Sequence, residues 1–442
     1  MEETSLKMID EKIKEFGPQL IGFTTISTQY PFISRVASHV KTHWPSIFLL
    51  VGGAYISLAP HNVLSDEFDA LCIGEGEYPT AELVAQLEAG EYPHKIQNLW
   101  IKKKDKSIEK NPTRPYIQNI DSLPFPDRRM WKDLIENGEG SKQVVLAARG
   151  CPFKCTYCSN HALKKVASSE YVRFRSEEDI LKEILFLSEQ YPENRRIYFQ
   201  AETLNINKKW VIELCNQLEL FNETLDKPFQ YSCNFFVIRK FLDEEIFMAF
   251  RRANFVSISI GLESGSERIR KEVLKRNYSN EDFLKAASLT RSYGMKLYVY
   301  NIIGIPGETL QDYNETVRIN NLVNPDISFT NIFIPYPGTD LYEVCKAQGL
   351  VKCPFGVSYE RQKAPVDMPG FSKKEIERAY HWFEYRVYKG HKSFRFRLKS
   401  VLERKVESNH ITNCLYSRLR QGYSKVRSNV AFRNKQININ HS

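Results

Sequence analysis

The sequence predicts an α/β fold with two parallel sheets, followed by a mainly helical C-terminal region. Short apolar segments alternate with longer amphipathic segments along most of the chain, and glycines or polar residues follow several of the apolar ones. This alternation is typical of strands joined by helical crossovers, which places the strands in parallel sheets. A charged and proline-containing run, Lys102–Asp127, divides the pattern into two series. The chain has 442 residues, 42% of them hydrophobic, which is enough for roughly two or three domains.

Residues 1–101 are expected to form a shortened, Rossmann-like domain with a parallel sheet. Its strands are predicted at Leu20–Ile26, Ile47–Val51 and Phe68–Ile73, and its helices at Phe32–Thr42 and Thr80–Glu88. Gly52, Gly53 and Gly74 follow two of these strands, at the sheet edge where open α/β folds bind ligands. Glycine there permits either a sharp turn or the close approach of a ligand, and the sequence leaves both interpretations open.

Residues 143–350 repeat a strand–loop–helix unit six times and predict a partial TIM barrel of the (βα)6 type. The strands are predicted at Val144–Ala148, Arg196–Gln200, Gln230–Asn234, Val256–Ile260, Leu297–Ile303 and Ser328–Ile334. The helices are predicted at Glu177–Tyr191, Lys208–Phe221, Asp243–Ala253, Asn280–Tyr293, Leu310–Val323 and Leu341–Gln348. In such barrels the chemistry lies on loops at the carboxyl ends of the strands. Residues 102–142 are expected to be a linker or strap, and residues 351–442 a basic, mostly helical region.

The positive charge of the chain is concentrated at its C-terminal end. The net charge is +9, yet the residues from Arg386 onward contain 14 Lys and Arg against two acids. A solvated surface is the simplest interpretation, and contact with nucleic acid, a phosphorylated substrate or a membrane surface is the alternative. The segment Ser393–Lys405 can form a basic amphipathic helix, which suits a membrane surface. We therefore expect this region to be able to contact an anionic partner.

The N-terminus, the apolar segments and the cysteines together predict a cytoplasmic protein. The first residues are acidic and polar rather than apolar, unlike a signal peptide. The longest apolar run, Ile47–Ile56, is shorter than a membrane span and contains two glycines. The nine cysteines lack the density and spacing of a secreted disulfide framework.

Three cysteines lie on the loop after the first barrel strand, in the stretch "RGCPFKCTYCSN". They are Cys151, Cys155 and Cys158. A structural zinc site needs four ligands, and His161 is the nearby candidate for the fourth. An iron–sulfur cube held by three thiolates instead leaves one iron open to a substrate or cofactor. The position at the mouth of a barrel favours the iron–sulfur cluster, while the zinc site stays an alternative.

This motif in this setting resembles the radical S-adenosylmethionine (radical SAM) enzymes, over about Val144–Gly349. Leu20–Ala89 is similar to the cobalamin-binding domain of one large subgroup of that family. The resemblance implies that the three cysteines bind a [4Fe–4S] cluster whose open iron chelates S-adenosylmethionine. It also implies reductive cleavage of that cofactor, with an electron donor of the flavodoxin or ferredoxin type. The resulting radical would start hydrogen abstraction or radical methyl transfer on an organic substrate that the sequence does not identify.

The resemblance also assigns cofactor-binding roles to residues on other loops. Tyr157 would lie near the adenine, Glu202 would accept a hydrogen bond from the methionyl ammonium, and Glu263 would bind the ribose hydroxyls. Ser264 would shape the turn after Glu263, and Gly304 and Pro306 would lie on a loop facing the adenosine. Each acid alone is more often a helix-start residue, and the glycine and proline are more often turn residues. Ala201 replaces an acid that relatives carry at that position.

The cobalamin-binding resemblance is incomplete at its start. Relatives carry a first βα unit with a D-x-H-x-x-G motif, whereas about 19 residues precede Leu20 here and no histidine lies in such a motif. The domain therefore looks truncated. Thr24, Thr25, Ser27 and the Gly52–Gly53 pair could still line a groove for the nucleotide tail. We expect cobalamin binding to be weak or absent, without a histidine nitrogen on cobalt.

Two alternative functions stay open at this level. The first is a cobalamin-independent radical SAM oxidoreductase or isomerase. The second, from a different class, is a nucleic-acid-binding protein that carries zinc or a cluster and has no turnover. Iron content separates the second from the radical SAM interpretation, because a zinc protein would be colourless.

Overall fold

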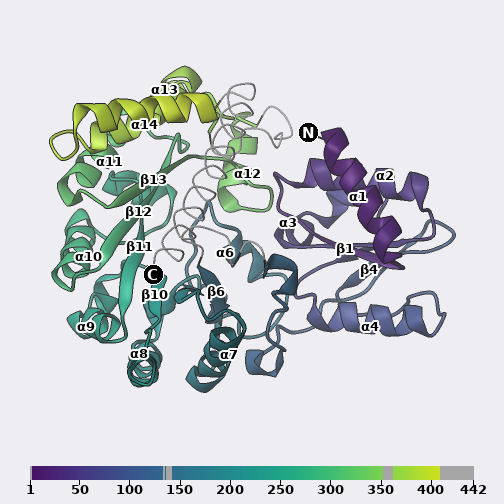
Figure 1. The fold of residues 1–442 in the computed structure, drawn as a ribbon. Coiled ribbons are helices and arrows are strands. Elements are labelled where there is room, and N and C mark those ends of the chain that lie inside the picture. Colours follow the sequence, from purple (N-terminus) through teal and green to yellow (C-terminus); the bar gives the residue numbers. More distant parts are fainter. Residues whose placement is uncertain (1, 133–134, 136–141, 352–361, 409–442) are drawn as a thin grey trace, which may run out of the picture.

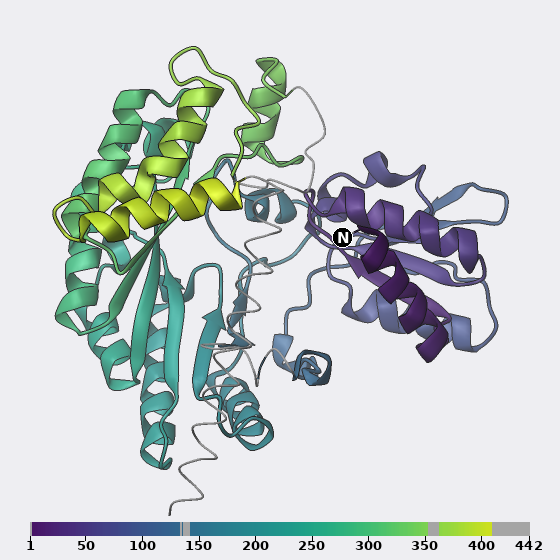
Figure 2. The same ribbon diagram turned by 45° about the horizontal axis from the view of Figure 1, so that its top comes forward.

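The computed structural model describes residues 2–132, 135, 142–351 and 362–408. An N-terminal α/β domain lies beside a larger barrel domain, and two C-terminal helices pack on the outside of the barrel (Figure 1). Turning the molecule shows the same arrangement, with the N-terminal domain joined to the barrel along one side (Figure 2). No helix among the described residues is both long and apolar enough to cross a membrane.

The N-terminal domain contains one five-stranded sheet in the order β1-β2-β3-β4-β5. The strands are β1 Leu20–Thr24, β2 Phe48–Gly52, β3 Ala70–Cys72, β4 Leu99–Lys102 and β5 Ile108–Lys110. The helices are α1 Glu2–Phe16, α2 Tyr30–His43, α3 Ala54–Leu58 and α4 Glu77–Glu88. The first three strands are parallel, as predicted, and the last two join as an antiparallel pair.

The central strand β2 explains why this sheet has a helix layer on each face. Its residues alternate between the two faces, as in any strand. Leu49 and Val51 belong to one buried cluster with residues of α1 and α2, and Phe48 and Leu50 belong to another with Leu83 of α4. A strand buried on both faces appears in the sequence as a continuous apolar run.

The boundary predicted at residue 101 is wrong, because the chain returns to the sheet before the strap begins. The hairpin β4–β5 extends to Lys110, within the segment expected to be a linker. Leu99 and Ile101 are fully buried against the sheet, and Lys110 lies over the ring of Trp100 at 4.7 Å. Charged residues are frequent in this hairpin, and they obscure the alternation of apolar and polar residues that would have predicted two strands. Helix α1 was likewise not predicted.

The barrel confirms the (βα)6 prediction. Its sheet has the order β13-β12-β11-β10-β9-β6, and every neighbouring pair is parallel. The strands are β6 Gln143–Leu146, β9 Arg196–Gln200, β10 Gln230–Phe235, β11 Phe255–Glu263, β12 Lys296–Ile303 and β13 Ile327–Ile332. The helices are α6 Ser159–Leu163, α7 Glu177–Gln190, α8 Lys208–Glu223, α9 Glu244–Arg252, α10 Asn280–Ser292, α11 Leu310–Val323 and α12 Asp340–Ala347.

Polar caps fix where the long barrel helices begin. The side chain that caps each N-terminus accepts a hydrogen bond from a backbone N–H of the first turn, which satisfies a group that the helix itself leaves unpaired. The caps are Ser176, Asn207, Asp243, Ser279, Thr309 and Thr339. Each cap is the last residue of a loop that follows a strand at the carboxyl edge of the sheet. The caps therefore fix where the loops that could hold catalytic residues end.

The described part of the C-terminal region is helical, as predicted. Helix α13, Lys373–Val387, packs against β13 and α11, and α14, Phe394–Glu407, packs against α13. Phe371 and Phe383 fill a buried cluster with Ile303 and Tyr313 of the barrel. The expected basic tail beyond residue 408 lies outside the described residues.

Candidate functional site

A short antiparallel pair holds the cysteine loop at the mouth of the barrel. Strand β7, Ala148–Arg149, leads into the loop and pairs with β8, Arg173–Phe174, which leaves it. Gly150 follows β7 with a φ of +84°, and a Cβ there would lie 2.0 Å from the carbonyl oxygen of Tyr171. Only glycine fits this position, so the chain enters the three-cysteine segment in one fixed direction.

Burial disfavours the thiolate form of all three cysteines. Cys151 and Cys155 are buried and Cys158 is half-buried. Burial raises the pKa of Cys151 to about 12 and that of Cys155 to about 11, and it also raises the pKa of Cys158. Because thiolates are the form that binds iron, a metal centre must displace these protons to be held here. The donor set of three thiols on one loop fits an iron–sulfur cluster that leaves one iron open.

The side-chain positions do not decide between the zinc and the cluster interpretation. Among the described residues, no group of three His, Cys, Asp or Glu side chains converges as the ligands of one ion would, and this includes the three cysteines. His161, the expected fourth ligand, has its Nε2 atom 2.9 Å from a carboxylate oxygen of Asp340 on α12.

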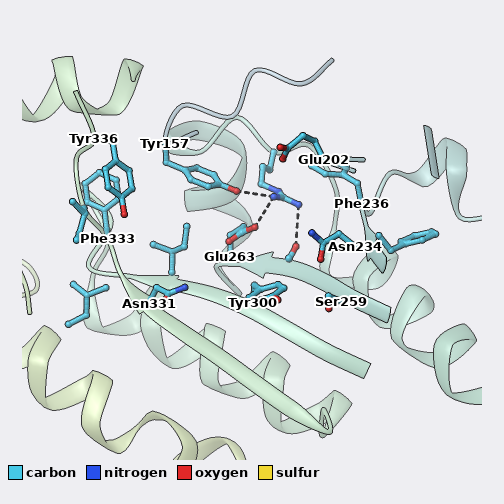
Figure 3. Close-up of a pocket in the computed structure, with 16 residues that line it drawn as sticks. Tyr157, Glu202, Asn234, Phe236, Ser259, Glu263, Tyr300, Asn331, Phe333 and Tyr336 are labelled. Carbon is cyan, nitrogen blue, oxygen red and sulfur yellow. Dashed lines mark hydrogen bonds and ion pairs between the residues drawn. The ribbon is translucent and has the colours of Figure 1, made fainter. Parts of the chain in front are cut away.

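A cavity of about 440 Å³ opens beside the cysteine loop at the carboxyl ends of the barrel strands. Its lining comprises Tyr157, Glu202, Asn234, Phe235, Phe236, Ser259, Gly261, Glu263, Arg276, Tyr300, Ile302, Asn331, Ile332, Phe333, Ile334 and Tyr336. Tyr157, Glu202 and Glu263 therefore come together, as the sequence predicted, although their segments lie far apart in the chain. Figure 3 shows these three side chains around the same space.

Arg276 links the cysteine loop to Glu263. Its guanidinium is buried and donates hydrogen bonds to the hydroxyl of Tyr157 at 2.9 Å and to a carboxylate oxygen of Glu263 at 2.8 Å (Figure 3). It also lies 4.2 Å from the ring centre of Phe236, which stacks on Phe153 of the cysteine loop. A buried guanidinium with these partners is rigid, and no motif around Arg276 indicates that it belongs to the site.

The backbone at Glu263 is strained, and the strain directs its carboxylate. Its φ is +60°, a left-handed conformation that costs a non-glycine residue about 1–3 kcal/mol. Gly261 makes room for it, since a Cβ on Gly261 would lie 2.3 Å from a carboxylate oxygen of Glu263. Burial raises the pKa of Glu263, and the nearby charge of Arg276 opposes that rise. Strain of this kind persists where the surrounding structure fixes the residue, as at ligand sites.

Glu202 lies at the junction of two cavities. It is exposed, and it lines both the barrel cavity and a second cavity of about 300 Å³. Burial is the main cause of the raised pKa values of Cys151 and Cys158, and the negative charge of Glu202 also raises both. Glu202 therefore lies near the cysteine loop. Its carboxylate has no hydrogen-bond or ion-pair partner among the described residues, so it is available to a ligand on either side.

The second cavity lies between the N-terminal domain and the barrel. From the N-terminal domain and the strap, its lining comprises Gly53, Ala54, Ser57, Gly74, Glu75 and Tyr116. From the barrel, the lining comprises Leu146, Ala148, Arg149, Gly150, Asn160, Leu163, Tyr171, Arg173, Gln200 and Glu202. The glycines that follow β2 and β3 therefore line a cavity, while Gly53 is also required by the local turn, because its φ is +102° and a Cβ there would lie 2.5 Å from the carbonyl oxygen of Thr25.

Glu75 joins the two domains beside this cavity. Its carboxylate accepts hydrogen bonds from Arg149 at 2.8 Å, from Arg173 at 2.9 Å and from the backbone N–H of Ile117 at 2.7 Å. Glu77 accepts a further hydrogen bond from Arg149 at 2.6 Å. The two arginines belong to β7 and β8, on either side of the cysteine loop. Nothing in the local sequence around Glu75 indicated this role.

Three of the predicted cofactor residues do not line either cavity. Ser264 is buried and lies 3.5 Å from the hydroxyl of Thr316 on α11. Gly304 donates its N–H to Glu308, and Pro306 is buried in the same turn. Burial raises the pKa of Glu308 to about 8. The structure thus places these residues in turns that shape the barrel mouth, and a direct contact with a cofactor stays a prediction for them.

Two family models match the chain, each on one of the two large domains. That of the B12-binding domain matches residues 2–84, and that of the Radical SAM superfamily matches residues 145–319. The chain contains a radical SAM domain and a B12-binding domain. The first model matches although the D-x-H-x-x-G motif is absent from the sequence. The radical SAM domain implies a [4Fe–4S] cluster and S-adenosylmethionine, and the B12-binding domain makes cobalamin plausible.

Curated proteins from several organisms are similar to this chain over most of its length. An uncharacterised methyltransferase of Pyrococcus horikoshii is 28% identical over 353 residues, which cover 79% of this chain and 74% of the relative. The anaerobic magnesium-protoporphyrin IX monomethyl ester cyclase of Rubrivivax gelatinosus is 25% identical over 77% of this chain and 61% of the relative. The cytidylyl-2-hydroxyethylphosphonate methyltransferase of Streptomyces wedmorensis is 22% identical over 77% of this chain and 68% of the relative.

Solved structures of radical SAM proteins have the same fold. The methyltransferase TsrM of Kitasatospora setae, with cobalamin and a [4Fe–4S] cluster bound, matches with a TM-score of 0.61 at 15% identity, over 78% of this chain and 68% of that one. The cobalamin-dependent enzyme OxsB with aqua-cobalamin bound matches with a TM-score of 0.65 at 14% identity, over 95% of this chain and 69% of that one. At these identities the likeness shows the fold alone.

Proposed function

We propose that this radical SAM protein cleaves S-adenosylmethionine reductively in the barrel cavity and uses the radical for methyl transfer or hydrogen abstraction on an organic substrate. The observation that carries the proposal is the position of the cysteine loop. Two cavities flank this loop and meet at Glu202, one in the barrel and one against the B12-binding domain. Such an arrangement suits two cofactors that act on one substrate. Cobalamin-dependent radical methyl transfer is the form of the reaction that would use both cavities, and the incomplete cobalamin-binding domain predicts that this chain holds the cofactor only weakly.

The three cysteines would hold the cluster. Bound to their thiolates, a [4Fe–4S] cluster supplies the electron that breaks a carbon–sulfur bond of S-adenosylmethionine. Burial of the thiols limits the access of water and oxygen to this position. The electron itself must come from a donor, which we propose to be of the flavodoxin or ferredoxin type. Exposure of such a cluster to oxygen would be harmful, which fits a cytoplasmic location.

The lining of the barrel cavity supplies complementary groups for S-adenosylmethionine. The free carboxylate of Glu202 can accept hydrogen bonds from the methionyl ammonium, and the carboxylate of Glu263 faces the cavity where ribose hydroxyls would lie. Arg276 places a positive charge in the same lining, which suits the carboxylate of the cofactor. The aromatic ring of Tyr157, fixed by its hydrogen bond with Arg276, offers a face for the adenine.

When the reaction is methyl transfer, the interdomain cavity would accept part of the cobalamin, since its volume of about 300 Å³ is too small for the whole cofactor. Gly53 and Gly74 give that cavity a wall without side chains, and Arg149, Arg173 and Glu75 give it a polar rim suited to amide groups. No histidine is among its lining residues. Binding without a histidine nitrogen on cobalt stays a prediction from the missing sequence motif.

Anaerobic reconstitution of the full chain with iron and sulfide tests the proposal. The expected result is a brown protein with about four irons per chain that forms 5′-deoxyadenosine from S-adenosylmethionine under a strong reductant. A colourless protein that retains stoichiometric zinc would overturn the proposal. A protein that holds the cluster and forms 5′-deoxyadenosine without any bound cobalamin would favour the cobalamin-independent alternative.

A further inference from the structure

Helix α14 carries apolar side chains beyond the face that it buries. The buried face packs on α13, where Val401 is buried and Arg404 forms an ion pair with Glu384 at 2.7 Å. Phe394, Leu398 and Leu402 follow at intervals of four residues, which aligns them in one stripe beside that face. Phe394 is 59% exposed and Leu402 is 56% exposed, although the Phe394 ring lies 6.3 Å from the ring of Tyr385 on α13. A surface helix needs only one apolar face, so this exposed apolar area is more than the described fold uses.

Cations flank the exposed stripe. The cations between the end of α13 and the middle of α14 are Lys389, Lys392, Arg395, Arg397 and Lys399. No acid lies between Glu384 and Glu403, and the latter lies 3.6 Å from Lys399. The sequence after residue 408 adds six Lys and Arg and no Asp or Glu. Repulsion between like charges therefore argues against that segment as the cover of this helix.

We propose that α14 binds the surface of an anionic lipid bilayer. An exposed apolar stripe between cations is the pattern of helices that lie in the plane of a membrane interface. Phenylalanine and leucine side chains enter the boundary between headgroups and acyl chains, while lysine and arginine face anionic headgroups. The buried face of α14 remains attached to α13, so the protein would bind as a folded unit.

A nucleic acid fits this surface less well than a bilayer. Phosphates would pair with the cations, yet three large apolar side chains would gain nothing from a polyanion. A bilayer uses both features, because burial of the stripe adds to the attraction of the charges. Figure 1 shows α14 on the outside of the molecule, over α13 and away from the N-terminal domain. That position leaves the helix accessible without blocking the cavities.

Co-sedimentation of the full-length protein with lipid vesicles tests the proposal. The vesicles are phosphatidylcholine alone or phosphatidylcholine with phosphatidylglycerol. We expect binding to the anionic vesicles that weakens with salt, and much weaker binding to the neutral ones. The double variant Leu398→Ser/Leu402→Ser should lower the partition coefficient about tenfold or more. Arg395→Gln/Lys399→Gln should also lower it, by about fivefold for each charge near the leaflet.

A matched control separates this helix from surface leucines in general. Leu220 on α8 and Leu322 on α11 are as exposed as Leu402 or more so, and Leu220→Ser/Leu322→Ser should leave vesicle binding unchanged. Circular dichroism checks that each variant is folded. The proposal is overturned if the protein does not bind anionic vesicles or binds neutral ones equally. It is also overturned if the α14 leucine variant binds as well as the control, or if an RNA oligomer binds at the same salt concentration and displaces the vesicles.

Discussion

Replacing Glu75 by alanine removes a carboxylate that Arg149 and Arg173 share across the two domains. The side chain of Arg173 is only 4% exposed, so its charge loses its ionic partner in a buried position. Loss of one partner of a buried pair costs about 3–5 kcal/mol, and the lower value applies here because Arg173 still donates to the carbonyl oxygen of Ile117. We expect the two strands that bracket the cysteine loop to open more readily by about 3 kcal/mol.

Hydrogen exchange followed by mass spectrometry measures this local opening. A change of about 3 kcal/mol corresponds to about a hundredfold faster exchange in peptides that cover residues 148–175. Glu75→Gln keeps an acceptor for the N–H of Ile117 but loses the charge, and should have a smaller effect of about 2 kcal/mol.

The matched control is Glu82→Gln, which removes another carboxylate that binds an arginine. Glu82 accepts two hydrogen bonds from Arg114 at 3.0 Å, but its side chain is 49% exposed, so the pair should contribute less than about 1 kcal/mol. Exchange in residues 148–175 should not change in this variant. If Glu75→Ala leaves that exchange unchanged, or accelerates it equally in the distant strand β12, then Glu75 does not hold the cysteine loop.

Four further predictions concern the site. Formation of 5′-deoxyadenosine should be abolished by each of Cys151→Ala, Cys155→Ala and Cys158→Ala. The control Cys215→Ala, in the barrel core, should retain it. Activity in any of the first three variants would contradict the role of the cluster. Glu202→Ala should weaken S-adenosylmethionine binding by about 1.5–3 kcal/mol in a titration without lowering iron content, and an unchanged affinity would leave Glu202 as a loop acid. In the metal-free protein, the raised pKa values keep the thiols of Cys151 and Cys155 protonated at pH 8. Iodoacetamide should therefore alkylate them slowly at pH 8, at rates that rise toward pH 11. Rapid labelling at pH 8 would show that the thiols are not desolvated. Added hydroxocobalamin should bind weakly, and its reduced form should show no histidine nitrogen splitting in electron paramagnetic resonance; tight binding or such splitting would contradict the two parts of this prediction.

The alternation of strands and helices was predictable because local signals agree with the fold in the barrel. Strand β9 and helix α11 have the predicted bounds, and the capping pair of Thr309 and Asp312 marks the start of that helix in the sequence itself. Helix α1 and the hairpin β4–β5 were missed although both carry apolar residues in register. In α1, Leu6, Ile9 and Ile13 follow one another at intervals of three and four residues and all pack on the same core, so the helical pattern was present in the sequence.

The cysteines and two of the acids were predictable because they lie in short motifs or just after predicted strands. Arg276 was not, because its contact with Tyr157 spans 119 residues of the chain and its own surroundings have no motif. The same holds for Glu75, whose partners Arg149 and Arg173 follow it by 74 and 98 residues. The contact of Arg276 depends on how distant segments of the barrel meet, and those of Glu75 depend on how the two domains meet, neither of which local patterns encode.

The shared position of Glu202 has a thermodynamic consequence for the two cavities. A ligand that binds its carboxylate from the barrel side removes the negative charge that a ligand on the other side would encounter. The affinity of each cavity therefore depends on the occupancy of the other, and linkage requires the two effects to be equal in free energy. A cationic group bound in one cavity disfavours a second cationic group in the other, so the order in which cofactor and substrate arrive is coupled through a single side chain.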